Sequence, residues 1–139
     1  MKVMFMISAR ANGVGGHFHS LRSVIDALSS HIDCVAVNVG RAKSPVLHGI
    51  TGVERQILYG RLGEYGAWRS LCKVTEHERP DIIHSFDVPS LFFARLLARR
   101  YRKPLVHNKC GGPNPSGWYP LVDDLVLFSV ENYDYFSSN

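Results

Sequence analysis

The fold is decided by residues 2–30, KVMFMISARANGVGGHFHSLRSVIDALSS. They begin with a short apolar run at 3–7, which is typical of a parallel strand buried on both faces. Small and turn-forming residues follow as far as Gly16, and apolar residues then recur at helical spacing. The apolar stripe of this helix consists of Phe18, Leu21, Val24, Ile25 and Leu28. A strand, a glycine-rich turn and a helix in this order predict the first unit of a parallel α/β sheet.

The turn between this strand and this helix is a candidate anion site. The first N–H groups of a helix have no partner within it and carry partial positive charge, and glycine lets a ligand approach the backbone closely. We therefore expect a phosphate-bearing ligand such as a nucleotide sugar against Gly15 and Gly16, with the guanidinium of Arg10 as a cationic neighbour. An alternative stays open, in which these glycines serve only the tight turn and the packing of helix on strand.

Two familiar nucleotide motifs do not fit the sequence. When a G-x-G-x-x-G dinucleotide motif is counted from Gly13 and Gly15, Phe18 stands where the third glycine belongs. The end of the second strand, at 37–41, has no carboxylate for the ribose hydroxyls of a dinucleotide. The sequence also lacks the G-x-x-x-x-G-K-[ST] motif of nucleoside triphosphate sites. A nicotinamide-dinucleotide-binding domain is therefore kept only as the less favoured alternative.

Composition and charge indicate the class of protein and its partners. The 139 residues are enough for one domain, and the formal charge of +4 suits anionic partners. Three cysteines without CxxC spacing favour a reducing cytoplasm, and no apolar run approaches the roughly 20 residues that span a bilayer. Scattered histidines without an H-E-x-x-H motif predict no metal site, and nucleic-acid reader motifs are missing.

The remaining sequence alternates between strand-like and helix-like segments. Further strands are expected at 34–39, 53–59, 80–85, 103–107 and 124–129, and further helices at 64–78, 89–101 and 131–136. The helix at 89–101 is expected to turn Leu91, Phe92, Leu96 and Leu97 inward. This alternation predicts one Rossmann-like domain over 1–139, with a three-layer, doubly wound, mainly parallel sheet and helices on both faces. Ligands bind such sheets beyond the carboxyl ends of the strands, so the loops at 10–16, 85–90 and 108–117 should share one mouth.

Several short motifs occur in a recognisable order. Gly15-Gly16-His17 precedes the first helix, Pro-Asp-Ile-Ile-His-Ser occupies 80–85, and Lys-Pro-Leu-Val at 103–106 runs into Gly-Gly-Pro at 111–113. The strand at 124–129 then closes in serine. Over nearly its whole length, the chain resembles the amino-terminal, Rossmann-like half of a family 4 glycosyltransferase of the GT-B type. The sequence departs from that pattern at Phe86 and Cys110, where the family often has histidine.

The resemblance implies an enzyme that transfers a sugar with retention of configuration. The donor would be a nucleotide sugar, as a substrate and not a cofactor, with its diphosphate against Gly15 and Gly16. The acceptor would be a glycan or a lipid-linked molecule of the bacterial cell envelope. The resemblance also implies a carboxy-terminal GT-B lobe, in the same or another chain, that holds most of the nucleotide. Without that lobe the chain is expected to be inactive. A non-catalytic Rossmann-like partner module is the main alternative.

The predicted mouth contains several candidate contacts to the acceptor. These are His17, Asp87, Asn108, Lys109 and Cys110, with Lys109 best suited to an anionic acceptor group. Asp87 has an alternative role as the N-cap of the following helix, and His17 as a cap of its own loop. Catalytic residues are not assigned.

A basic cluster lies on and after the third predicted helix, at Arg95, Arg99, Arg100, Arg102 and Lys103. Arg95, Arg99 and Arg102 are spaced to share one helix face, which could rest on an anionic membrane. This hypothesis would place a cytoplasmic enzyme peripherally on the inner face of the membrane. The alternative is an ordinary solvated helix face, because the opposite side of the helix is needed for the core.

Overall fold

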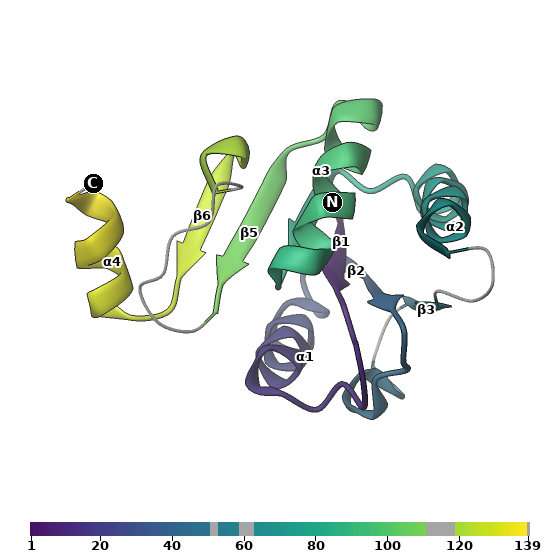
Figure 1. Cartoon of the computed structure of the whole chain (residues 1–139), viewed down its shortest axis with the longest axis horizontal. Coiled ribbons are helices and arrows are strands. Elements are labelled where there is room, and N and C mark those ends of the chain that lie inside the picture. The colour runs from purple at the N-terminus through teal and green to yellow at the C-terminus, as the bar shows by residue number, and fades with distance from the viewer. Residues whose placement is uncertain (51–52, 59–62, 111–118, 139) are drawn as a thin grey trace.

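A computed structural model describes residues 1–50, 53–58, 63–110 and 119–138 of the chain. Within this part, six strands form one parallel sheet in the order β3-β2-β1-β4-β5-β6 (Figure 1). The strands are β1 (Lys2–Ile7), β2 (Asp33–Gly40), β3 (Val53–Leu58), β4 (Ile82–Ser85), β5 (Leu105–Lys109) and β6 (Asp124–Leu127). The helices are α1 (Gly16–Leu28), α2 (Gly63–Glu78), α3 (Val88–Tyr101) and α4 (Val130–Ser137), with short 3-10 turns η1 (Pro45–Leu47) and η2 (Tyr119–Leu121). The predicted Rossmann-like fold is confirmed.

Strand β1 is the third of the six strands across the sheet, and both of its edges are paired. Its residues pair with β2 on one side, from Lys2 opposite Asp33, and with β4 on the other, from Val3 opposite Ile82. The chain first builds outward through β2 and β3 and then returns to the opposite edge of β1. Strand order therefore reverses between β1 and β4, and a crevice forms at the carboxyl ends of such strands.

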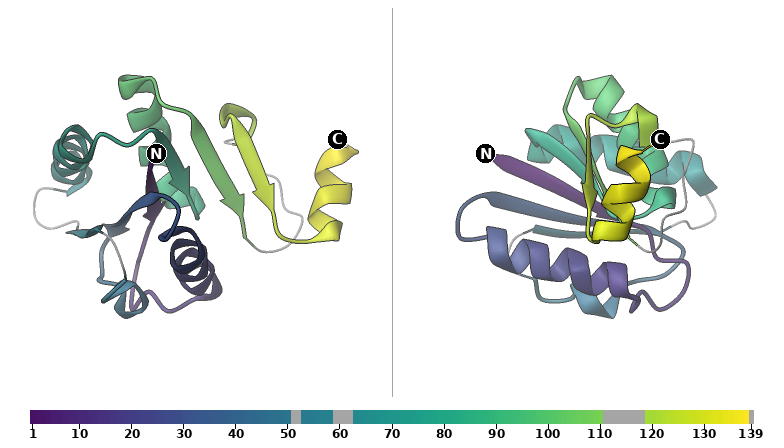
Figure 2. Two further views of the ribbon diagram at one scale, coloured as in Figure 1. Left: turned by 180° about the vertical axis from the view of Figure 1, so that it is seen from behind. Right: turned by 90° about the vertical axis from the view of Figure 1, so that its left-hand side faces the viewer.

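Helices cover both faces of the sheet (Figure 2). Alternate residues of β1 belong to the buried clusters on the two faces. Val3, Phe5 and Ile7 belong to the buried cluster that includes α1 residues. Met4 and Met6 belong to the cluster that includes residues of α2 and α3. Burial on both faces explains why the run at 3–7 is apolar without alternation.

The prediction for the inward face of α3 is wrong in part. Leu91 and Leu97 are buried as expected, but Phe92 and Leu96 are 39% and 40% exposed. Phe93 is buried in place of Phe92, because the helix is turned by about one residue from the predicted phase.

Two further expectations from the sequence concern a glycine-rich turn and membrane-spanning segments. The Gly-Gly-Pro turn at 111–113 lies outside the described residues. In the described segments, no helix has both the length and the apolar character that crossing a bilayer requires.

Candidate functional site

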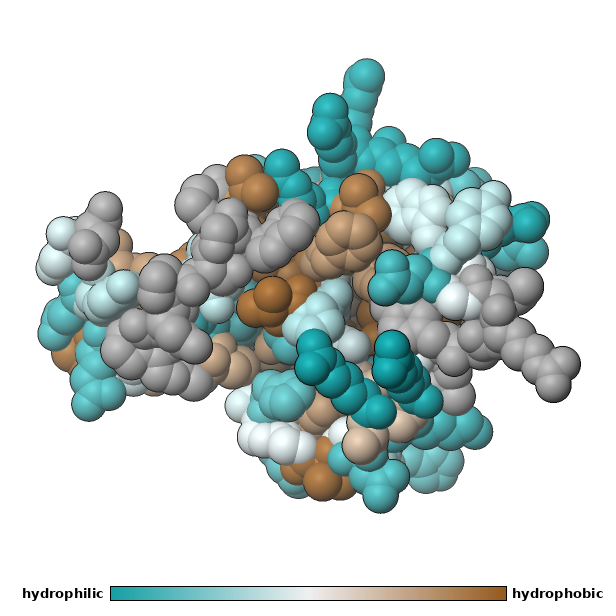
Figure 3. Space-filling model, in the orientation of Figure 1, coloured by the Kyte–Doolittle hydropathy of each residue, from teal (hydrophilic) through white to brown (hydrophobic). Residues whose placement is uncertain are grey.

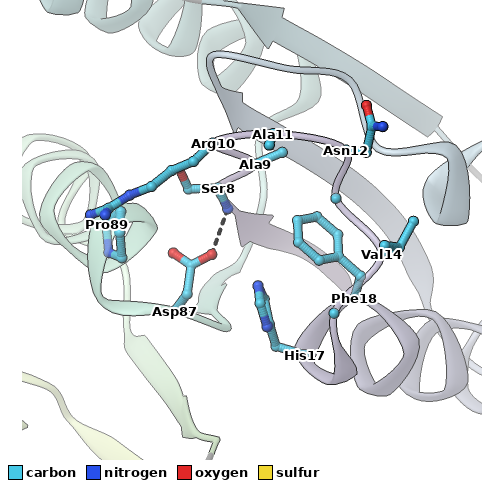
Figure 4. A pocket seen from close by; sticks show the side chains of 12 residues that line it. Ser8, Ala9, Arg10, Ala11, Asn12, Val14, His17, Phe18, Asp87 and Pro89 are labelled. Carbon is cyan, nitrogen blue, oxygen red and sulfur yellow. Dashed lines mark hydrogen bonds between the residues drawn. The ribbon is translucent and has the colours of Figure 1, made fainter.

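A pocket of about 400 Å³ opens at the carboxyl ends of β1 and β4 (Figure 4). Its lining comes from the loop between β1 and α1, the first turn of α1 and the loop between β4 and α3. The lining residues are Ser8, Ala9, Arg10, Ala11, Asn12, Gly13, Val14, Gly15, His17, Phe18, Asp87 and Pro89. Two of the three loops that were expected to share a mouth therefore do so. Of the third, residues 108–110 do not line this pocket, and 111–117 lie outside the described residues.

The amino-terminal end of α1 borders this pocket without a capping side chain. Gly15 is the N-cap, its backbone is extended, and the first turn contains no acidic residue. Among the described residues, none accepts a hydrogen bond from the N–H of Gly16 or of His17. Gly15 lines the pocket, while a Cβ added at Gly16 would meet no heavy atom within 4 Å. The helix thus presents its positive end in open space, where an anion can approach it.

The glycines of the turn do not all have the same role. A Cβ at Gly13 would lie 2.7 Å from Cζ of Phe18 and 3.1 Å from Cβ of Ala9. Phe18 is itself buried beneath the loop. Close packing therefore explains Gly13, as in the alternative weighed from the sequence, whereas no such packing constrains Gly16.

The loop after β1 is tied to the end of β2. The N–H of Ala9 donates to Oδ1 of Asn38 (3.0 Å), and Nδ2 of Asn38 donates to the carbonyl of Ala42 (3.0 Å). The N–H of Arg41 donates to the carbonyl of Ala9 (2.7 Å). At Gly40, a Cβ would collide with the backbone of Ala9. The sequence shows only that this stretch lacks a carboxylate, and it does not predict that the stretch holds the pocket wall.

Asp87 joins the two loops that form the pocket. Its Oδ2 accepts from the N–H of Ser8 and its Oδ1 from the N–H of Ser90, both at 2.6 Å. The predicted N-cap role at the start of α3 is confirmed. Burial raises the pKa of Asp87, whereas the donors Ser90 and Ser8 and the charge of His17 act in the opposite direction.

Replacing Asp87 by alanine is expected to lower the free energy of unfolding by about 2–3 kcal/mol, since the helix loses its cap and two amides lose their acceptor. Urea denaturation followed by circular dichroism measures this difference. Asp26→Ala is the matched control because Asp26 makes only a surface ion pair with Arg22 at 3.6 Å. Equal unfolding midpoints for the two variants would contradict the assigned role.

His17 projects into the pocket toward Asp87 (Figure 4). Its ring packs on Phe18 with the ring centroids 4.6 Å apart, and its charge favours the ionised form of Asp87. No described residue forms a hydrogen bond with this ring, so the alternative role as a loop cap has no contact to support it. An imidazole beside a carboxylate can hold a hydroxyl group of a ligand and exchange a proton with it.

The end of β5 approaches the same region but contributes less to the pocket than expected. Burial raises the pKa of the half-buried Cys110 thiol, and the nearby charge of Asp87 raises it further. Asn108 and Lys109 are both 2% exposed and do not line the pocket. Oδ1 of Asn108 lies 2.9 Å from Nε2 of His84, and Nζ of Lys109 donates to the carbonyl of Cys110 at 3.2 Å. Acceptor contacts by Asn108 and Lys109 stay predictions, and the structure places both side chains below the surface.

His107, on the same strand, is buried beneath the mouth. Its Nδ1 lies 2.8 Å from Oγ of Ser85, and its ring packs on Tyr119. Burial lowers the pKa of His107 to about 4, with further lowering from the positive charges of His84 and Lys109. The imidazole is therefore neutral at physiological pH.

This lowered pKa predicts a loss of stability in acid. The unfolded chain protonates this imidazole below about pH 6.5, but the folded chain does so only near pH 4, so acid favours unfolding between these values. At pH 5 this group alone should lower the free energy of unfolding by about 2 kcal/mol relative to pH 7. Urea denaturation measures the free energy of unfolding at pH 7 and at pH 5. The difference between these two free energies should shrink by that amount in His107→Gln. It should not change in His19→Gln, which alters an exposed histidine. An unchanged difference in His107→Gln would contradict the prediction.

In the part of the chain that is described, no group of three His, Cys, Asp or Glu side chains is placed to hold a metal ion. The described lining of the pocket offers a ligand backbone amides and the side chains of His17, Asp87 and Arg10.

Comparison with known proteins gives matches only at the level of structure. No protein-family model matches the sequence, and no curated protein sequence matches it. Anabaena HepE in complex with UDP-glucose superposes with a TM-score of 0.74 at 16% identity, over 99% of this chain and 40% of that chain. The lipopolysaccharide outer core galactosyltransferase WaaB gives a TM-score of 0.73 at 16% identity, over 99% and 42% of the two chains. The chain shares their fold.

The same fold also occurs in proteins of a different activity. A UDP-N-acetylglucosamine 2-epimerase from Rickettsia bellii matches with a TM-score of 0.68 at 18% identity, over 99% of this chain and 41% of that chain. The present chain thus spans 40–42% of the length of these three proteins.

Proposed function

We propose that this chain is the amino-terminal, acceptor-binding domain of a retaining GT-B glycosyltransferase, which moves a sugar from a nucleotide-sugar donor to a glycan or lipid-linked acceptor. One observation carries the proposal: the N–H groups of Gly16 and His17 have no partner among the described residues and stand beside an open pocket where strand order reverses. The likeness in fold to HepE with UDP-glucose and to the galactosyltransferase WaaB supports it.

In this proposal the donor diphosphate lies against Gly15 and Gly16. Negative charge develops on the leaving nucleotide as its bond to the sugar breaks, and fixed amides at the positive end of α1 stabilise that charge. Arg10 lines the same pocket and is exposed, so its guanidinium can reach a phosphate oxygen.

The acceptor lies toward the opposite wall of the pocket. Asp87 and His17 face each other there, and Cys110 lies close enough for the charge of Asp87 to affect it. A carboxylate oxygen that already accepts one amide keeps a further lone pair for a sugar hydroxyl. His17 can hydrogen-bond the same or a neighbouring hydroxyl.

A carboxy-terminal lobe, in the same or another chain, completes the proposed enzyme. The share of 40–42% that this chain covers in its structural neighbours supports this view. We place the reaction in the cytoplasm, with a membrane-bound acceptor as one option. The retention of configuration comes from the resemblance to family 4 glycosyltransferases.

Titration of the ¹⁵N-labelled chain with UDP-glucose tests the donor site. Saturable shifts are expected at the amides of Gly15, Gly16 and His17, while Gly63, at the start of α2, serves as the control because Glu64 already occupies that first turn. Shifts confined to other regions would contradict the donor site. In the complete enzyme, the anomeric configuration of the product, measured by ¹H NMR, tests retention, and an inverted product would refute it.

A nucleotide-sugar epimerase is the second candidate, favoured by the likeness in fold to the Rickettsia bellii enzyme. The two candidates differ in their need for an acceptor. Conversion of UDP-N-acetylglucosamine to its 2-epimer by the complete enzyme, without any added acceptor, would favour the epimerase.

A further inference from the structure

A second pocket of about 440 Å³ adjoins the first and shares Arg10 with it, but its other charged residues, Arg41 and Glu64, have no role in the proposal above. It lies between the loop after β1, the end of β2 and the beginnings of α2 and α3. We call it the side pocket. The residues that give it its chemical character are Arg10, Arg41, Glu64, Pro89, Phe92 and Phe93.

The charges of the side pocket are not balanced within the protein. Arg10 and Arg41 are exposed, and neither guanidinium has a hydrogen-bond or ion-pair partner in the described parts of the chain. Glu64 supplies one carboxylate, but it stands in the first turn of α2, where the helix dipole already favours a negative charge. Two guanidinium groups that line the same pocket therefore suit an anion with several oxygens.

The side pocket also has an apolar wall. Phe92 is 39% exposed although its neighbours Leu91 and Phe93 are buried. Hydrophilic and apolar side chains meet near the middle of this face of the molecule, between α1 and α3 (Figure 3). Covering the exposed part of Phe92 with an apolar group would be favourable.

The two pockets meet at Arg10. Ser8, Ala9, Arg10 and Pro89 line both of them, and the Arg10 side chain runs from its loop toward Pro89 (Figure 4). A ligand in the side pocket can therefore extend past Arg10 to place a hydroxyl beside Asp87 and His17.

We propose that the side pocket binds an anionic group of the acceptor, a phosphate or a carboxylate attached to an apolar stem. This inference rests on the proposed function, because it assigns the ligand of the side pocket to the acceptor substrate. The oxyanion contacts the guanidinium groups of Arg10 and Arg41, and the stem covers Phe92. The acceptor class is then an amphipathic anion and not a neutral glycan.

Titration of the isotope-labelled chain with small probes tests this pocket directly. The probes are hexyl phosphate, hexanoate, inorganic phosphate and hexanol, and the signals are the Nε–Hε groups of Arg10 and Arg41 and the ring of Phe92. Hexyl phosphate or hexanoate should give saturable shifts at these signals, with weaker binding of inorganic phosphate and of hexanol. Whichever of the two amphipathic anions binds more tightly identifies the acceptor's anion as phosphate or carboxylate.

A pair of arginine variants gives the specific comparison. Arg41→Gln should weaken binding of the tighter probe roughly tenfold, as expected for a lost charge-assisted hydrogen bond. Arg69→Gln removes the same charge from an exposed position on α2 outside both pockets and should leave the affinity unchanged. Raising the salt concentration should weaken probe binding to the unmodified chain.

Two results would overturn the inference. One is the absence of saturable shifts with both amphipathic anions, and the other is equal weakening by Arg41→Gln and Arg69→Gln. Binding of UDP-glucose to the unmodified chain is followed at the amide signals of Gly15 and Gly16, which differ from the Arg10, Arg41 and Phe92 signals that report on the side pocket. Failure of the donor site and failure of the side pocket are therefore observed separately.

Discussion

Gly40→Ala will lower the free energy of unfolding by about 3 kcal/mol, which is a large effect for the addition of one methyl group. The added Cβ would collide with the carbonyl oxygen, the nitrogen and the carbonyl carbon of Ala9. These are backbone atoms, and they cannot move away without breaking the hydrogen bond from Arg41 N–H to the Ala9 carbonyl. The tie between the loop after β1 and the end of β2 is then lost.

Urea denaturation monitored by circular dichroism measures this loss. Gly16→Ala is the matched control, because the same methyl group there meets no heavy atom within 4 Å. Its free energy of unfolding should stay within about 0.5 kcal/mol of the unmodified chain. If Gly40→Ala is as stable as the control, the close approach of these two backbone segments is not needed for the fold.

Gly16→Val will weaken UDP-glucose binding at least about tenfold while leaving the fold intact. The Cβ of the new side chain meets no heavy atom within 4 Å in the free protein, and Gly16 is exposed, so we expect the packing to be preserved. The same side chain stands beside the N–H groups of Gly16 and His17, where the donor diphosphate is proposed to lie. The variant therefore separates a ligand role of this glycine from a purely structural one.

Isothermal titration calorimetry with UDP-glucose checks this result, and thermal unfolding confirms that the variant is folded. Ser23→Val, on the exposed face of α1, controls for the insertion of a β-branched residue into the same helix. Donor affinity equal to that of the unmodified chain would show that the diphosphate does not bind at this turn.

The order of strands and helices could be predicted because it depends on local patterns. The apolar run of β1 and the change to helical spacing after Gly16 are both visible within 30 residues of sequence. The phase of α3 was harder, because Phe92 and Phe93 are adjacent and equally apolar. Hydropathy cannot decide which of two such neighbours faces the core, and the sheet beneath them decides it.

The candidate site was predictable to a lesser degree. Gly15 and Asp87 could be found because a glycine-rich turn and an aspartate before a helix are local signals. Asn38 was missed because its contact is with Ala9, 29 residues away. The burial of Lys109 is not visible in the sequence either, because its place at the carboxyl end of a strand predicts a side chain at the mouth of the sheet.

The hydrogen bonds that join Ala9 to Asn38 and Arg41 form when the chain folds and do not wait for a substrate. This wall of the pocket is thus ordered before a ligand binds, and the protein loses little conformational entropy there on binding. Association should accordingly be limited by diffusion and orientation, without a slow rearrangement of this segment.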